Sequence, residues 1–185
     1  MDAHDLGGDL TVTLHTEAEL HRRLQELARE IEADYGDTPP LLVGVLKGAV
    51  MVMADLSRAL RFQAQMDWMA VSSYGAGTKS SGVVRILKDL DADIMGRDVL
   101  IVEDIIDSGL TLSWLKENLE NRGAKSVRIC TMLRKPDALK VEVDVAYVGY
   151  DIPNEFVVGY GLDYAEYYRN LRDVAILAPH VYSGE

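Results

Sequence analysis

Three carboxylates stand close together in the stretch VLIVEDIIDSGLT, which spans residues 99–111. Glu103 and Asp104 follow an apolar run directly, and Asp107 comes shortly after them. Carboxylates crowded in this way cost stability unless a ligand binds them, because like charges raise one another's pKa. Their oxygens accept hydrogen bonds from a vicinal diol, and they can hold Mg²⁺ directly or through water. The three acids therefore predict a binding site rather than a solvated loop.

The turn that follows these acids suits an anion. It carries small and hydroxyl-bearing residues and runs into a helical pattern: Ser108, Gly109, Leu110 and Thr111. Glycine lets the backbone approach a ligand closely, the first N–H groups of a helix bind phosphate, and hydroxyls add donors. A phosphate on the turn and a diol on the two adjacent acids together predict a cradle for ribose 5-phosphate. The sequence has no GxxxxGK[ST] stretch and no GxGxxG after a strand, which excludes a P-loop and a Rossmann site.

The segments around this motif predict an α/β fold of one domain, residues 1–185. Apolar runs predict strands over 41–46, 66–74, 97–102, 125–133, 143–150 and 173–179, and extended structure resumes over 83–90. A capping box at Thr16–Glu19 and helical spacing predict a helix that ends near Gly36, and further helices follow Gly48 and precede Gly123. This alternation implies a mostly parallel sheet covered on both faces, with ligands beyond the carboxyl ends of its strands.

The overall charge limits the kinds of partner. A net charge of −11 repels nucleic acid and anionic membrane surfaces. The apolar run 41–56 is interrupted by Lys47 and Asp55, so we expect no membrane span. Cys130 is the single cysteine, which fits a reducing compartment, and the acidic N-terminus lacks a signal-peptide pattern. We therefore expect a cytoplasmic protein that acts on small molecules.

The stretch VEDIIDSGLT resembles the phosphoribosyl-pyrophosphate (PRPP) motif of purine and pyrimidine phosphoribosyltransferases. The motif is specific: a hydrophobic strand, two acids, two apolar residues, Asp, a small hydroxyl residue, Gly, any residue and Thr. The resemblance, which runs from about residue 40 to 175, implies the type I phosphoribosyltransferase fold. That fold has a mostly parallel central sheet flanked by helices, with a small hood region from the chain ends. It also implies that Asp107 is the base that takes the N7 proton of a purine, and a pKa raised by its neighbours would suit that role.

A second stretch, FVVGYGLDYAEYYRNL (156–171), is similar to the 6-oxopurine, or hypoxanthine-guanine, enzymes of this family. The similarity implies that Phe156 stacks on the purine and that the backbone of Val157 contacts the base edge. It places Asp163 near the base and the metal, and Arg169 on the pyrophosphate. An aromatic ring and a guanidinium suit these two tasks chemically.

Three shorter segments fit the same resemblance. Lys135, in TMLRKPD, matches the lysine that donates to the purine 6-oxo group, and such an ammonium rejects the 6-amino group of adenine. Lys47 and Gly48 match a pyrophosphate loop in which the peptide bond before the lysine can be cis, although Ala49 replaces a common glycine. Ser73 and Tyr74 match the start of a mobile lid over residues 72–82, which would exclude water from a reactive sugar.

The implied reaction transfers the 5-phosphoribosyl group of PRPP to hypoxanthine or guanine. IMP or GMP and pyrophosphate are the products, and Mg²⁺ at Glu103, Asp104 and Asp163 neutralises the departing pyrophosphate. The family also implies a homo-oligomer, either a dimer or a tetramer. Two alternatives stay open: a relative that prefers xanthine, and a nucleotide-sensing regulator that binds RNA. The net charge of −11 argues against the second, because RNA needs a basic face.

Overall fold

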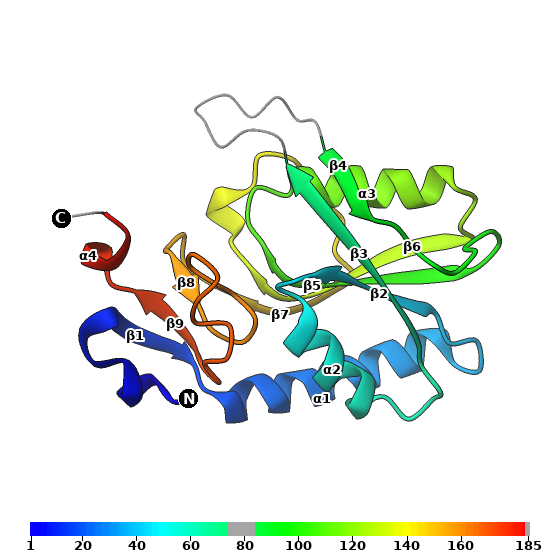
Figure 1. The fold of residues 1–185 in the computed structure, drawn as a ribbon. Coiled ribbons are helices and arrows are strands. Elements are labelled where there is room, and N and C mark those ends of the chain that lie inside the picture. The colour runs from blue at the N-terminus through cyan, green and yellow to red at the C-terminus, as the bar shows by residue number, and fades with distance from the viewer. Residues whose placement is uncertain (74–83, 184–185) are drawn as a thin grey trace.

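A six-stranded sheet forms the centre of the computed structural model, which describes residues 1–73 and 84–183 (Figure 1). In spatial order its strands are β4 (Val84–Lys88), β3 (Gln65–Ser73), β2 (Leu41–Leu46), β5 (Asp98–Ile106), β6 (Ser126–Arg134) and β7 (Tyr147–Asp151). All neighbours pair in parallel except β3 and β4, which form an antiparallel edge. The carboxyl ends of five strands therefore meet at one edge of the sheet, as the sequence predicts for an α/β fold.

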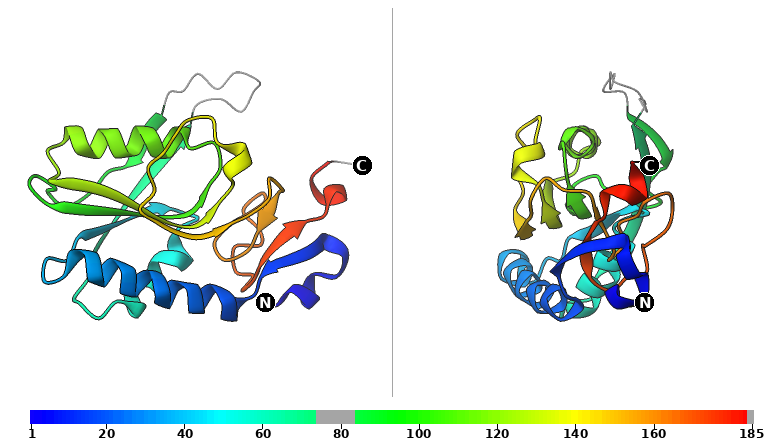
Figure 2. Two further views of the ribbon diagram at one scale, coloured as in Figure 1. Left: turned by 180° about the vertical axis from the view of Figure 1, so that it is seen from behind. Right: turned by 90° about the vertical axis from the view of Figure 1, so that its left-hand side faces the viewer.

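Helices cover both faces of this sheet. Helices α1 (Glu17–Tyr35) and α2 (Val50–Ala59) pack on one face, and α3 (Leu110–Asn121) packs on the other (Figure 2). Side chains of β5 alternate between the two cores: Leu100 and Val102 join the α1–α2 side, whereas Val99 and Ile101 join the α3 side. Burial on both faces explains why β5 reads as a continuous apolar run rather than an alternating one.

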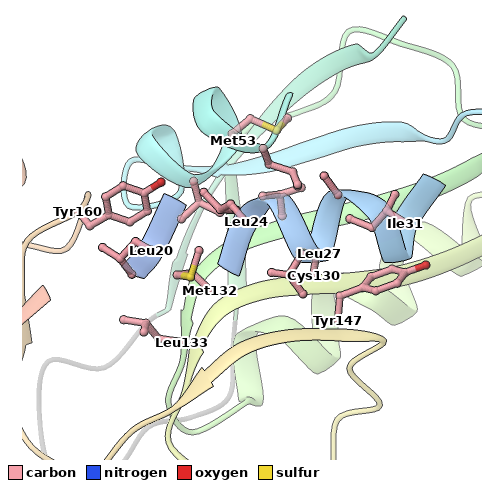
Figure 3. Packing of buried hydrophobic residues seen from close by; sticks show 14 of the residues in the cluster. Leu20, Leu24, Leu27, Ile31, Met53, Cys130, Met132, Leu133, Tyr147 and Tyr160 are labelled. Carbon is pink, nitrogen blue, oxygen red and sulfur yellow. The ribbon is translucent and has the colours of Figure 1, made fainter. Parts of the chain in front are cut away.

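Helix α1 begins and ends where the sequence predicts. The Thr16 side chain accepts from the Glu19 backbone, and the Glu19 side chain accepts from the Thr16 N–H at 2.8 Å. Gly36 ends the helix with a positive φ of 53°. The inward face is buried against the sheet and α2, and its residues are Leu20, Leu24, Leu27 and Ile31 (Figure 3).

A smaller antiparallel sheet brings the two chain ends together. It contains β1 (Leu10–His15), β9 (Val174–Leu177) and β8 (Val157–Val158) in the order β1-β9-β8, and it has its own small core. Two short 3₁₀ segments, η1 (Ala3–Asp9) and η2 (Pro136–Ala138), and the short helix α4 (Pro179–Tyr182) complete the chain. We call the three-stranded sheet, together with the chain that links β8 to β9, the hood. The hood lies beside one end of the central sheet, and the residues that follow β8 reach that end (Figures 1 and 2).

The structure corrects two strand boundaries. Strand β5 continues to Ile106 instead of ending at 102, because β6 is equally long and keeps pairing with it through Ile106 and Arg134. Strand β7 starts at Tyr147 rather than at 143, because Val143 and Val145 pack against the α3 side of the core instead of joining the sheet.

The predicted lid over 72–82 falls outside the described residues from Tyr74 onward. Within the described part of the chain, no helix has both the length and the apolar character needed to cross a membrane.

Asp67 in β3 holds the chain that leaves β4. Its Oδ2 accepts from the Asp91 and Ala92 backbone N–H groups at 2.9 and 2.8 Å, and its Oδ1 accepts from the Trp68 N–H at 2.7 Å. Burial works to raise the pKa of this carboxyl, but these backbone donors and the nearby Lys88 bring it below its usual value. Asp67 is therefore an ionised, buried anchor for the β3–β4 hairpin.

Replacing Asp67 by Ala should lower the free energy of unfolding at pH 7 by about 1–3 kcal/mol, because backbone donors lose their acceptor. A carboxyl with a depressed pKa stabilises the fold above its ordinary pKa near about 4, and this contribution is lost as the pH falls through the folded-state pKa. The difference between wild type and variant should accordingly shrink in acid. Chemical denaturation from pH 7 to pH 3 measures it, with the exposed Asp37→Ala as the control. A difference that is independent of pH would contradict the role given to the charge.

Candidate active site

The end of β5 and the start of α3 form a small cavity of about 160 Å³. Its polar lining comes from the predicted motif: Glu103, Asp107, Ser108, Gly109 and Thr111. Gly109 has a φ of 77°, and a Cβ there would meet Val143 at 2.9 Å, so glycine fits this turn for two independent reasons. The first N–H groups of α3 have no partner inside the helix and lie next to this cavity. The arrangement suits a phosphate.

The two adjacent acids lie in a setting that opposes their ionisation. Burial raises the pKa of Glu103 well above its usual value, and the neighbouring Asp104 charge adds to this effect. Burial also raises the pKa of Asp104 to about 6, although the Ile105 backbone N–H donates to it at 2.8 Å and Arg169 favours its charged form. Crowding by Asp104 therefore contributes to the raised pKa of Glu103, but burial is the larger cause. Hydroxyl donors or a cation would relieve this cost.

Gly48 lies between the acids and the hood. A Cβ at this position would overlap the Asp104 carboxylate, so a larger residue here would have to displace that side chain. On the hood side, a Cβ on Gly161 would overlap the carbonyl oxygen of Gly48. The peptide bond between Leu46 and Lys47 is cis, as the family resemblance anticipated. Sequence reasoning assigned Gly48 to free backbone amides alone and missed both of these contacts.

A second cavity, of about 150 Å³, joins β5, β6 and the hood. It is lined by Ile105, Asp107, Lys135, Phe156, Val157 and Leu162. The Lys135 ammonium donates to Asp107 Oδ2 at 3.1 Å, and the Lys135 side chain is only 9% exposed. Four residues that the resemblance assigned to base recognition and proton transfer therefore share one cavity, although they come from three separate segments. The apolar Ile105 and Leu162 were missed, since they carry no chemical signal of their own.

Phe156 is partly exposed and has an aromatic neighbour that the sequence did not reveal. The Tyr182 ring stacks on it with centroids 5.1 Å apart and an interplanar angle of 23°. Tyr164 contacts it edge to face at 5.7 Å. Tyr182 stands on the short helix α4, far along the chain, so no local pattern could connect it with Phe156. Together the rings form an aromatic wall beside the second cavity.

The Glu166 carboxylate bridges two cations, Lys47 in the loop after β2 and Arg169 after β8. Lys47 Nζ contacts Glu166 Oε2 at 2.8 Å, and Arg169 Nη2 contacts Glu166 Oε1 at 3.2 Å. Arg169 also binds Asp163 at 2.9 Å and the Gly161 carbonyl at 2.8 Å. Its buried Nε finds no acceptor among the described residues. Glu166, which sequence reasoning did not select, thus occupies the position that an anionic ligand of both cations would take.

The predicted metal residues approach one another without forming a closed ligand set. Among the described residues, Glu103, Asp104 and Asp163 are not a trio whose oxygens all lie within 4.8 Å of one another. The Asp163 charge nonetheless adds to the raised pKa of Asp104, so these two carboxylates lie near each other. Mg²⁺ commonly uses one or two carboxylates, several waters and substrate phosphates, and an open pair of acids fits that pattern.

The remaining predicted residues fall at the margins. Leu110 begins α3, and its N–H lies 3.4 Å from the Ser108 hydroxyl. Ser73 ends β3 at the same edge of the sheet as the loop after β2, because β2 and β3 are parallel. Tyr74 lies outside the described residues, so its predicted place in a lid stays a prediction.

Comparison with known proteins gives a consistent result. A family model described as "Phosphoribosyl transferase domain" matches residues 13–165. The hypoxanthine-guanine phosphoribosyltransferase of Mycobacterium avium is 58% identical over 181 residues, which cover 95% of this chain and 89% of that protein. The Bacillus subtilis protein of the same name is 52% identical over 176 residues and covers 95% and 98%. The crystal structure of a hypoxanthine phosphoribosyltransferase from Staphylococcus aureus superposes with a TM-score of 0.92 at 44% identity and covers 96% and 97%.

The matches cover nearly the whole chain, and the superposition agrees with the arrangement of its elements. This chain therefore belongs to the phosphoribosyltransferase family, among its hypoxanthine-guanine members.

Proposed function

We propose that the protein transfers the 5-phosphoribosyl group of PRPP to hypoxanthine or guanine, releasing pyrophosphate and forming IMP or GMP. One observation carries this proposal: the Asp107–Lys135 ion pair lies in a cavity that also holds Phe156, next to the cavity of the phosphate turn. Within this one cavity, the Asp107 carboxylate can accept the N7 proton of a 6-oxopurine, and the Lys135 ammonium can donate to the 6-oxo group. The Phe156 ring can stack on the plane of the base. The adjacent turn matches a 5-phosphate.

The corner at the end of β5 positions the sugar. The turn Ser108–Thr111 binds the 5-phosphate through backbone N–H groups and hydroxyls, and Glu103 and Asp104 accept from the ribose hydroxyls. The bond from C1′ to the pyrophosphate oxygen breaks with its electron pair on pyrophosphate, and C1′ develops positive charge as in glycoside chemistry. Negative charge on the nearby acids favours that state. A purine nitrogen then forms the new bond to C1′.

The second cavity handles the base. Asp107 accepts the proton that the purine loses at N7 while Lys135 balances the charge that grows on O6. Phe156 stacks on the ring and the Val157 backbone meets its edge. Lys47, Gly48 and Arg169 hold the departing pyrophosphate. Mg²⁺ at Asp104 and Asp163, with Glu103 close by, would neutralise the negative charge on pyrophosphate when it is bound.

The wider setting is also part of the proposal. The 185 residues act as one domain, residues 72–82 close over the site as a lid, and the protein works as a cytoplasmic homo-oligomer, a dimer or a tetramer. The single cysteine supports a reducing compartment. Sedimentation of the purified chain at working concentration measures the oligomeric state.

Steady-state assays with PRPP and each of hypoxanthine, guanine, xanthine and adenine test the substrate class, and turnover of adenine alone would overturn it.

Replacing Asp107 by Asn should lower kcat by about 10²–10⁴-fold, because an amide cannot accept the N7 proton. The amide oxygen can still accept from Lys135, so the KM for PRPP should change only modestly. Initial rates with each substrate varied in turn separate the two constants. Equal turnover in variant and wild type would reject Asp107 as the base.

Replacing Lys135 by Ala should weaken the use of hypoxanthine and guanine by about 10- to 150-fold in kcat/KM, which is the loss of one hydrogen bond from a charged donor. The nearby exposed Lys140 offers a matched control, and Lys140→Ala should leave these constants unchanged. Both variants are measured in the same spectrophotometric assay. Unchanged base affinity and rate in Lys135→Ala would show that the purine pocket is assigned wrongly.

Replacing Glu166 by Gln should tighten the binding of PRPP and pyrophosphate, because the Glu166 carboxylate would no longer compete with these anions for Lys47 and Arg169, while Asp163 still binds Arg169. The gain should be largest at low salt, since exposed charges are screened by added ions. The KM for PRPP across a series of salt concentrations is the measurement, with the exposed Glu155→Gln as the control. A weaker affinity for PRPP in Glu166→Gln would mean that Glu166 helps to arrange the cations instead of competing for them.

A further inference from the structure

Tyr160 adopts a backbone conformation that bulky residues rarely take. Its φ is 51°, and it stands between Gly159 and Gly161, whose φ values are 95° and 100°. Glycine accepts such angles freely, whereas an aromatic residue in the left-handed region needs support from its surroundings. Only 6% of Tyr160 is exposed, so that support comes from the interior of the protein.

For the Tyr160 side chain, this support includes a partly buried hydrogen bond. The Tyr160 hydroxyl donates to Asp55 Oδ2 of α2 at 2.7 Å. The same oxygen lies 3.0 Å from His21 Nε2 of α1, and Arg58 binds the other oxygen of Asp55. Asp55 is therefore fixed by two helices, and it fixes the Tyr160 ring in turn.

The backbone on either side of Tyr160 supports the pyrophosphate half of the site. Gly161 lies so close to the Gly48 carbonyl that a Cβ could not fit between them. The Gly161 N–H donates to the Arg169 carbonyl at 3.0 Å, and the Gly161 carbonyl accepts from Arg169 Nη1 at 2.8 Å. The Tyr160 N–H donates to the Leu171 carbonyl at 2.8 Å. A shift of this turn would move both Gly48 and Arg169.

We propose that Tyr160, held by Asp55, is a positioning residue for the pyrophosphate site. It does not touch substrate. Its hydroxyl fixes the ring, the ring fixes the left-handed turn, and the turn sets Gly48 and Arg169 at the distance that pyrophosphate needs. This inference rests on the proposed function, because it assigns a role in binding PRPP and pyrophosphate.

The chain contains a matched control for this bond. Tyr147 is also buried, with 3% exposed, and its hydroxyl donates to Asp34 Oδ2 at 2.7 Å, where Arg128 binds the same acid. Both tyrosines belong to the same hydrophobic core, and they lie at opposite ends of the buried face of α1 (Figure 3). Tyr147 stands in β7, at the opposite end of α1 from Tyr160 (Figure 3). Loss of its hydroxyl should therefore cost stability alone.

The experiment compares Tyr160→Phe with Tyr147→Phe in the intact chain. Thermal unfolding should show similar losses of Tm in both, since each loses one hydroxyl-to-carboxylate bond. In Tyr160→Phe alone, the KM for PRPP and the KM for pyrophosphate in the reverse reaction should rise by about five- to twentyfold, because small misplacements of binding groups are costly. The KM for hypoxanthine should stay within about twofold of wild type.

Three outcomes would overturn the inference, and the third would also overturn the proposed function. If Tyr160→Phe loses stability but keeps its PRPP and pyrophosphate constants, the residue is only structural. If the purine KM rises as much as the PRPP KM, the residue does not act on the pyrophosphate half. If wild type shows no PRPP-dependent turnover of any 6-oxopurine, the proposed function fails as well. Calorimetric titration of each variant with pyrophosphate gives a readout that does not depend on turnover.

Discussion

The structure depends on two partly buried carboxylates at the end of a parallel strand. Glu103 and Asp104 stand where β5 still pairs with β6, and burial raises the pKa of both. Such groups are costly without partners. Neighbouring elements adapt to them: the loop after β2 has glycine at position 48 because the Asp104 carboxylate fills the space of a side chain. Sugar hydroxyls and a divalent cation are the ligands that would offset this cost.

Much of this arrangement could be predicted from local patterns. The capping box predicts the start of α1, and the acidic motif with its serine, glycine and threonine predicts the turn that lines the first cavity. These features are readable because each depends on residues close together in the chain. Strand β5 was longer than its apolar run suggested, because pairing with β6 carries it through the acids.

The features that sequence could not give depend on distant contacts. Strand β9 falls within the predicted strand 173–179, whereas β1 had no local signal strong enough to assign it, because its partner lies at the other end of the chain. The bridging position of Glu166 and the stack of Tyr182 on Phe156 arise only once the hood is folded. The support of Tyr160 by Asp55 likewise needs α2 and the hood together. In each case packing, rather than residue type, determines the role.

The pairing of the hood has a consequence for the order in which the protein becomes competent during synthesis. The acids of β5 and the lysine after β6 leave the ribosome early, and the central sheet can begin to form around them. The segment 156–169 contains β8. Strand β8 pairs with β9, and β9 pairs with β1. We therefore expect a nascent chain to form the turn at the end of β5 first and to place the segment 156–169 last, when β9 emerges and joins β1.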